Sequence, residues 1–277
     1  MCTFKITNNP NKHWIDNFLA LGGPTLTNSV EIAGVYITHH LLHITGELTP
    51  QPVERNGKYF LLMGEFYNYD ASLRSDIYFG IEKYLEYGDD FTAHMDGEFL
   101  FIVYDPSKQT IDFFTDPWST RQVWYREQGG HFYFTTLVND KNALYSIETT
   151  RISLRRFVDK DEQYRLPHNS HCRYDIKNKS LKIVNDALHK WNFDQNVNTL
   201  EDVEKYFTEA VLKRWYPNCT LFLSGGLDSS SVALCLTDNK KKFNSLSLML
   251  RSRYEDKDVI KKVLSYCKDY INHYSID

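Results

Sequence analysis

Residues 221–232 read LFLSGGLDSSSV, an apolar run followed by a turn of serine and glycine and then by a helical pattern. A helix N-terminus presents free N–H groups, and glycines let an anion approach the backbone closely. Asp228 would repel a phosphate there, and a bridging Mg²⁺ is the usual way to relieve that repulsion. The segment therefore predicts a phosphate and metal site, although it lacks the Gly-Lys-Ser/Thr of a Walker A loop. The alternative is a serine-capped turn that binds nothing.

The second candidate for chemistry is Cys2, which follows the initiating Met1. Removal of Met1 would set the thiol beside a free α-amine, so the nucleophile would carry its own base. The alternative is an incidental cysteine. The chain has five cysteines, an odd number without CxxC spacing, and this fits a reducing compartment better than a disulfide framework.

The elements that must position these residues change in character along the chain. Short aromatic and β-branched runs fill residues 1–185, and helical stripes interrupt them at 14–22 and 76–88. Beyond residue 190, helical patterns near 203–211, from about 229 and at 256–268 alternate with apolar runs at 220–223, 245–250 and 271–276. This order predicts a layered α+β domain followed by a parallel sheet of βαβ units.

The Ser/Gly turn resembles the pyrophosphate-binding loop of the N-type ATP pyrophosphatases, and most closely that of the asparagine synthetases. The resemblance implies that ATP and Mg²⁺ bind here, with Asp228 reaching the metal through the phosphates. In that family the next strand lines the adenine pocket. The ATP-binding residues implied are Leu223, Ser224, Gly225, Gly226, Asp228, Ser229, Ser230 and Leu248.

The N-terminal half resembles the same family. Glutamine-dependent asparagine synthetases begin with a cysteine, and the segments GEFYN (64–68), Ser75-Asp76, DGEFLFIVYD (96–105) and FFTDPWSTRQVWY (113–125) are similar to theirs. The resemblance implies an N-terminal-nucleophile sandwich (αββα) with a type 2 glutamine amidotransferase site at 1–190, then a truncated ATP-pyrophosphatase domain at 191–277. The implied catalytic residues are Cys2 and Gly64, and the implied glutamine-binding residues are Glu65, Asp76, Leu42 and Ile44.

Two positions depart from the family pattern. Leu41 stands where the family has an arginine that pairs with the glutamine carboxylate, and Met63 stands where it has an oxyanion-binding asparagine. A buried carboxylate without its cation is penalised, and loss of one oxyanion donor lowers kcat by roughly 10²–10³. Glutamine hydrolysis, another amide substrate and a relic pocket therefore all remain open.

The predicted reaction is that of an asparagine synthetase-like ligase. ATP would activate a carboxylate, with aspartate as the first choice, as an acyl-adenylate, and ammonia, free or from glutamine at Cys2, would form the amide. The alternatives are a nucleotide-binding protein or an ATP hydrolase releasing AMP and pyrophosphate, and an amidohydrolase that works through Cys2 alone. A short parallel sheet would leave open edges and apolar faces, so a homo-oligomer or a complementary subunit is expected.

The composition excludes several classes of protein. The 277 residues are 42% hydrophobic and carry a net charge of −4, so a core is expected and a nucleic-acid partner is not. No signal sequence or membrane-spanning run is recognisable, and a cytoplasmic protein is expected. The cluster of His39, His40 and His43 is not expected to bind metal, because a strand over 37–45 would hold the first and last far apart.

Overall fold

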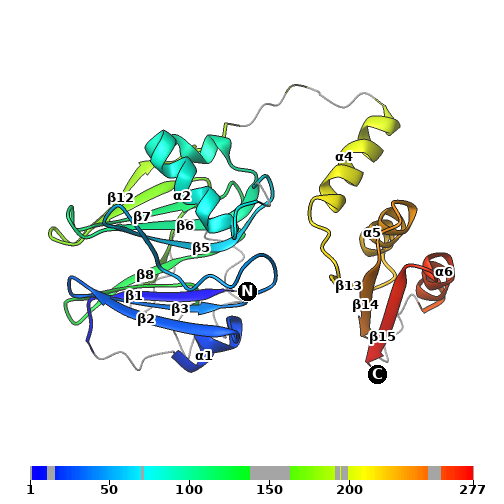
Figure 1. Ribbon diagram of the computed structural model, residues 1–277, viewed down its shortest axis with the longest axis horizontal. Coiled ribbons are helices and arrows are strands. Elements are labelled where there is room, and N and C mark those ends of the chain that lie inside the picture. Colours follow the sequence, from blue (N-terminus) through cyan, green and yellow to red (C-terminus); the bar gives the residue numbers. More distant parts are fainter. Residues whose placement is uncertain are drawn as a thin grey trace. The chain divides into compact units, whose positions relative to one another are not determined.

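The computed structural model describes residues 2–10, 16–69, 72–137, 163–190, 194, 199–248 and 257–276. Contacts divide the chain into two compact units, residues 1–191 (unit 1) and 192–277 (unit 2) (Figure 1). Each unit has its own hydrophobic core. Among the described residues, no helix combines the length and the apolar character that crossing a bilayer requires.

The described residues of unit 1 form two six-stranded antiparallel sheets. The strands of sheet A are β1 (Thr3–Thr7), β2 (Leu26–Ile32), β3 (Val35–Leu41), β8 (Trp124–Gln128), β9 (His131–Thr135) and β10 (Gln163–Arg165), in the order β10-β8-β9-β1-β3-β2. Those of sheet B are β4 (Val53–Arg55), β5 (Lys58–Phe66), β6 (Gly97–Asp105), β7 (Thr110–Thr115), β11 (His171–Asp175) and β12 (Ser180–Asn185), in the order β12-β11-β7-β6-β5-β4.

The two sheets pack face to face, and helices lie on their outer sides (Figure 1). Helix α1 (Asp16–Gly22) contacts β1 and β3 of sheet A. Helix α2 (Asp76–Tyr87) and the 3₁₀ helix η1 (Gly88–His94) pack against sheet B through a second, phenylalanine-rich core. The α+β class expected for this half is confirmed, and the described layers run helix, sheet, sheet, helix.

One expected strand is shorter than the sequence indicates. The run at 37–45 was expected to be a strand throughout, but β3 ends at Leu41. The next residue, Leu42, directs both its N–H and its carbonyl oxygen to the sulfur of Cys2 instead of to a neighbouring strand. His43 therefore lies outside the strand, and its Nε2 is 3.0 Å from the carbonyl oxygen of Gly46.

Unit 2 is built on a three-stranded parallel sheet. It comprises β13 (Thr220–Phe222), β14 (Phe243–Leu248) and β15 (Ile271–Ile276), in that order, with α4 (Leu200–Leu212), α5 (Leu227–Asp238) and α6 (Lys257–Cys267). The parallel pairing expected from alternating strands and helices is confirmed. Helix α5 begins two residues earlier than expected, because Gly226 takes the extended backbone that precedes a helix, with φ −70° and ψ 166°.

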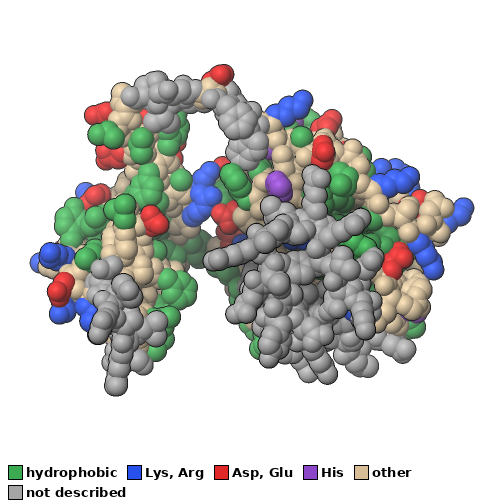
Figure 2. Space-filling model, turned by 180° about the vertical axis from the view of Figure 1, so that it is seen from behind, with side chains coloured by type: hydrophobic (Ala, Val, Ile, Leu, Met, Phe, Trp, Pro, Cys, Tyr) green, Lys and Arg blue, Asp and Glu red, His purple; other side chains and the backbone are tan. Residues whose placement is uncertain are grey.

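The two faces of this sheet differ. One face contributes Leu223 and Phe243 to the core formed with α5 and α6. The other carries Phe222, Leu246 and Tyr274 in register across all three strands. Phe222 and Tyr274 are 69% and 61% exposed, and hydrophobic side chains are visible at the surface of this unit (Figure 2). We call this row of three side chains the apolar row.

Candidate functional site

A cavity of about 80 Å³ in unit 1 lies between the start of β1, the end of β3, β5 and the start of α2. It brings together the six residues assigned to amide chemistry: Cys2, Leu42, Ile44, Gly64, Glu65 and Asp76. The remaining lining residues are Leu41, His43, Thr45, Glu47, Thr49, Gln51, Leu62, Ser75 and Arg121. We call this cavity the Cys2 pocket. Residues that are 74 positions apart in sequence, Cys2 and Asp76, thus line the same cavity.

Cys2 is held by the backbone of a single residue. Its Sγ accepts a hydrogen bond from the N–H of Leu42 at 3.4 Å and donates one to the carbonyl oxygen of Leu42 at 3.7 Å. Burial raises the pKa of the Cys2 thiol, while the bond from Leu42 and the positive amino terminus act in the opposite direction. The sulfur therefore rests as a thiol and needs a base to become a nucleophile.

Gly64 occupies a position in β5 that only glycine fits. Its φ is +116°, and a Cβ there would lie 1.8 Å from the carbonyl oxygen of Glu98. Gly97, on β6, makes a similarly close approach, since a Cβ on it would lie 2.3 Å from the carbonyl oxygen of Glu65. The two strands therefore run unusually close together beside the pocket, and Gly64 presents bare backbone there.

Asp76 is the acidic group at the start of α2. One carboxylate oxygen accepts a hydrogen bond from the N–H of Phe66 at 3.1 Å, and the other lies 3.3 Å from the hydroxyl of Ser75. Burial raises the pKa of Asp76 to about 6, and the nearby charge of Glu65 adds to the effect. When ionised, this carboxylate is suited to hold an ammonium group of a bound molecule.

The two residues that depart from the family pattern, Leu41 and Met63, lie in different environments. Leu41 lines the Cys2 pocket, so the position expected to hold a cation presents an apolar side chain. Met63 is fully buried in the core between the two sheets and does not line the pocket. Residue 63 therefore offers no side-chain donor to an oxyanion in the pocket, and the backbone N–H of Gly64 is the donor left at these two positions.

Sequence reasoning did not single out two polar residues of the pocket. Gln51 accepts a hydrogen bond from the N–H of Leu62 through its side chain, which fixes the pocket wall against β5. Arg121 lies in the segment 113–125 that was aligned with the family, but no spacing rule connects it with Cys2.

The second candidate site is the Ser/Gly turn between β13 and α5. Gly225 has φ +82°, and the hydroxyl of Ser224 lies 3.1 Å from that of Ser229 and accepts the N–H of Gly226. The buried hydroxyl of Ser230 has no hydrogen-bond partner among the described residues. The turn leaves the carboxyl end of a parallel strand, where α/β sheets bind ligands.

The other residues assigned to ATP lie around this turn. Asp228 is exposed in the first turn of α5, where a carboxylate can reach a metal held by phosphates. Leu248 is exposed at the end of the neighbouring β14. Leu223 differs, because its side chain is in the core and its backbone bonds to Leu246 and Ser247, so it positions the turn.

Comparison with known proteins gives these two sites a context. Residues 202–276 match the family described as asparagine synthase. This segment is similar to the asparagine synthases. The resemblance inferred from the sequence is therefore confirmed, and the matched segment contains the whole Ser/Gly turn.

Relatives of the asparagine synthetase type extend the match into unit 1. A protein of Methanocaldococcus jannaschii assigned as a glutamine-hydrolysing asparagine synthetase is 23% identical over 222 residues, with 73% of this chain and 40% of that protein covered. Glutamine-hydrolysing asparagine synthetase 3 of Bacillus subtilis is 23% identical over 206 residues, covering 64% and 32%. The chain thus spans less than half the length of these synthetases.

Among solved structures, glutamine phosphoribosylpyrophosphate amidotransferase of Bacillus subtilis, with ADP and GMP bound, aligns over 87% of this chain and 67% of its own. The TM-score is 0.39 and the identity 8%. The asparagine synthetase relationship therefore depends on the sequence matches.

Proposed function

We propose that the protein is an asparagine synthetase-like amidotransferase. It would release ammonia from an amide at Cys2 and use ATP at the Ser/Gly turn to activate a carboxylate. The observation that carries the proposal is the Cys2 pocket, which gathers Cys2, Gly64 and Asp76 from three separate elements. The family match over residues 202–276 supports the ATP-dependent half.

At the Cys2 pocket the proposed reaction is amide hydrolysis. The α-amine freed by loss of Met1 takes the thiol proton, and the sulfur attacks the amide carbon. The N–H of Gly64 stabilises the negative oxygen of the tetrahedral intermediate. The α-ammonium gives its proton to the amide nitrogen, and collapse releases ammonia and leaves a thioester. Water then cleaves the thioester to give the free acid and restore the thiol.

At the Ser/Gly turn the proposed reaction is activation of a carboxylate, with aspartate as the first candidate. The acid attacks the α-phosphorus of ATP, an acyl-adenylate forms and pyrophosphate leaves. Ammonia then displaces AMP to form the amide. Ser224, Ser229 and the N-terminus of α5 would hold the phosphates, and Asp228 would hold Mg²⁺, which neutralises phosphate charge when bound.

Product analysis tests both halves. The protein is incubated with ATP, Mg²⁺, aspartate and either glutamine or ammonium, and AMP, pyrophosphate and asparagine are measured. Cys2→Ala should abolish the glutamine-dependent reaction and spare the ammonium-dependent one. Asp228→Ala should abolish both, while Ser231→Ala, next to the turn, serves as the control. Absence of AMP and pyrophosphate with the unaltered protein under every condition would contradict the proposal.

A second candidate is a nucleotide-binding protein or an ATP hydrolase with a degenerate amide site. Leu41 in the pocket and Met63 in the core favour it, because each removes a polar group expected for glutamine hydrolysis. It requires ATP binding by calorimetry, weakened by Asp228→Ala, and no asparagine. Asparagine formation by the unaltered chain would exclude it.

A further inference from the structure

The charges around the Cys2 pocket are unbalanced. Three carboxylates line it, from Glu47, Glu65 and Asp76, and Arg121 is the one lysine or arginine among the described lining residues. Glu47 lies 3.7 Å from Arg74, which is exposed and does not line the pocket, so Glu65 and Asp76 remain to be balanced. A ligand carboxylate entering such a pocket meets repulsion unless a cation faces it. His43 also lines the pocket, but its Nε2 contacts the carbonyl oxygen of Gly46.

Arg121 reaches the pocket from a turn built on Asp116. The buried carboxylate of Asp116 accepts hydrogen bonds from the backbone N–H groups of Trp118 and Thr120 and from the hydroxyl of Thr120. The backbone turn is closed by a bond from the N–H of Ser119 to the carbonyl oxygen of Asp116. Arg121 follows directly, so the direction of its backbone is fixed.

The same turn is tied to the strand that carries Gly64. Phe99 on β6 pairs with Gly64 on β5. Phe99 also donates its N–H to the carboxylate of Asp116 and accepts the N–H of Asp116 at its carbonyl oxygen. Gly64, Phe99 and Asp116 thus form a row across three adjacent chain segments. The turn that precedes Arg121 therefore begins two segments away from Gly64, with only β6 between them.

We propose that Arg121 is the residue that binds the carboxylate of the amide substrate in the Cys2 pocket. Together with Asp76, which would bind the ammonium group, it fits the pocket to a zwitterionic amino-acid amide even though residue 41 is leucine. A guanidinium can bind a carboxylate through two parallel hydrogen bonds. This inference depends on amide chemistry at Cys2 and is independent of the Ser/Gly turn.

Protection of Cys2 from alkylation tests the proposal without turnover. The protein is treated with iodoacetamide at pH 8, and labelling of Cys2 is followed by mass spectrometry in the presence of three ligands. These are glutamine, 4-aminobutanamide, which lacks the α-carboxylate, and 4-carbamoylbutanoate, which lacks the amine. In the unaltered protein, glutamine should protect at about tenfold or more lower concentration than 4-aminobutanamide.

The variants separate the two ends of the ligand. Arg121→Met should raise the half-protecting concentration of glutamine about 10- to 100-fold and leave that of 4-aminobutanamide unchanged, with Arg121→Lys between. Asp76→Asn should show the opposite selectivity, weakening both amine-bearing ligands and sparing 4-carbamoylbutanoate. The alkylation rate without ligand and the unfolding midpoint show that each variant is folded.

Three outcomes would overturn the proposal. Equal protection by glutamine in Arg121→Met and the unaltered protein removes Arg121 from the site while amide chemistry stands. Equal protection of the unaltered protein by glutamine and 4-aminobutanamide shows that the pocket has no carboxylate site, even if no Arg121 variant folds. Protection by none of the ligands overturns amide chemistry at Cys2 as well. The proposed reaction at the Ser/Gly turn is then still tested independently by ammonium-dependent release of AMP.

Discussion

At the scale of single residues, the Cys2 pocket combines a resting thiol with a carboxyl group that titrates near neutrality. The N–H and the carbonyl oxygen of Leu42 both form hydrogen bonds with the sulfur of Cys2, and burial raises the pKa of the thiol so that it stays protonated. Asp76 lines the same pocket, and burial raises its pKa to about 6. Ammonium binding at Asp76 is therefore expected to strengthen as the pH rises through that value.

The raised pKa of Asp76 predicts a pH-dependent stability. Between its usual pKa of 3.8 and the folded value of about 6, the folded protein keeps a proton that the unfolded chain has lost. Stability therefore falls as the pH rises through this window, by at most about 3 kcal/mol, and is level above it. Asp76→Asn carries no charge, so its stability relative to the unaltered protein should be greater at pH 7.5 than at pH 4.

Urea unfolding at the two pH values measures this difference. Asparagine can still accept the N–H of Phe66, so the hydrogen bond is retained in the variant. A stability difference between variant and unaltered protein that is the same at both pH values would contradict the expectation.

Gly64 predicts a large cost for one added methyl group. In Gly64→Ala the new Cβ meets the carbonyl oxygen of Glu98 and the residue keeps φ +116°, so β5 and β6 must separate. We expect a loss of about 2–4 kcal/mol in the free energy of unfolding. Gly57→Ala is the matched control, because Gly57 also has a positive φ, +73°, but has open space around its Cβ position.

The control separates the cost of a positive φ from the cost of the collision between the new Cβ and the neighbouring strand. Gly57→Ala should cost only about 1 kcal/mol, since the backbone alone is strained. Similar losses for the two variants by chemical denaturation would show that the approach of β5 to β6 is less rigid than described.

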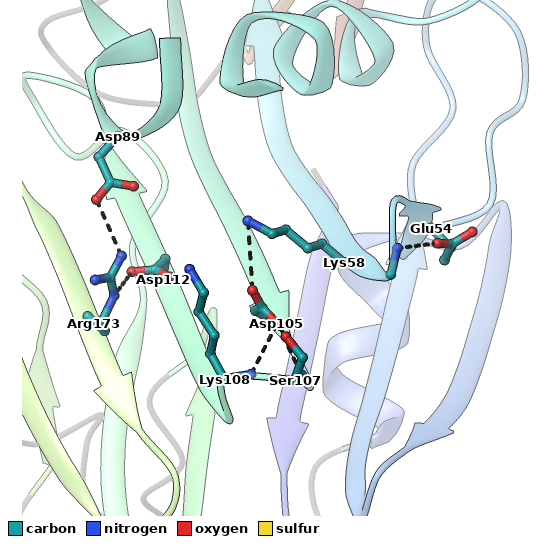
Figure 3. Close-up of polar contacts among 9 residues, drawn as sticks. Glu54, Lys58, Asp89, Asp105, Ser107, Lys108, Asp112 and Arg173 are labelled. Carbon is teal, nitrogen blue, oxygen red and sulfur yellow. Dashed lines mark hydrogen bonds and ion pairs between the residues drawn. The ribbon is translucent and has the colours of Figure 1, made fainter. Parts of the chain in front are cut away.

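At the scale of elements, a partly buried polar network joins η1 to sheet B (Figure 3). Asp112 on β7 accepts hydrogen bonds from His171 and Arg173 on β11, both at 2.6 Å. Arg173 also contacts Asp89 on η1 at 3.3 Å. Lys58 and Asp105, 3.7 Å apart, form a separate pair between β5 and β6.

Removing Asp112 should destabilise unit 1 strongly. Asp112 and His171 are 3% and 1% exposed, so Asp112→Ala leaves polar groups in the interior without their acceptor. The expected cost is about 3–5 kcal/mol, measured by chemical denaturation. Lys83→Ala, which breaks an exposed pair with Glu86, should change the stability far less, because solvent screens exposed pairs. A comparable effect of both substitutions would argue against this polar network as a source of stability.

Elements also show what the sequence can predict. The stripe at 76–88 and the pattern at 256–268 indicated α2 and α6 to within a residue or two, because both helices bury one apolar face. The strand expected at 37–45 was too long, since the sulfur of Cys2, 40 residues away, ends it at Leu41. Local periodicity carries no information on such a distant contact.

The candidate site shows the same contrast between what local sequence predicts and what distant contacts determine. The residues of the Cys2 pocket were named from a family resemblance, because nothing in their spacing links residue 2 with residues 64 and 76. Arg121 was missed because its position depends on the turn at Asp116, in which Ser119 adopts φ +48°. Serine is not a residue that signals a positive φ, and so the turn has no local signature.

At the scale of the whole molecule, the apolar row of unit 2 is the feature that calls for a partner. Parallel sheets are normally covered on both faces, and Phe222 and Tyr274 are largely exposed on one face here. We expect this face to be covered by a second copy of the chain. Phe222→Asp with Tyr274→Asp should then shift sedimentation from an oligomer to a monomer.

A control outside the apolar row accompanies this prediction. Leu21→Asp replaces an exposed leucine on α1 of unit 1 and should leave the sedimentation coefficient unchanged. A monomeric unaltered protein at micromolar concentration would show that the row does not bind a second copy.

The Cys2 pocket draws its walls from residue 2, from residues 64 and 76, and from residue 121. A ribosome must therefore release well over a hundred residues before the first-made cysteine meets its surroundings, and contacts of such long range form late in folding. During synthesis the thiol is an ordinary one, open to solvent and without a held substrate. A drop in its rate of alkylation would consequently report, in a growing or refolding chain, the moment at which the sandwich closes.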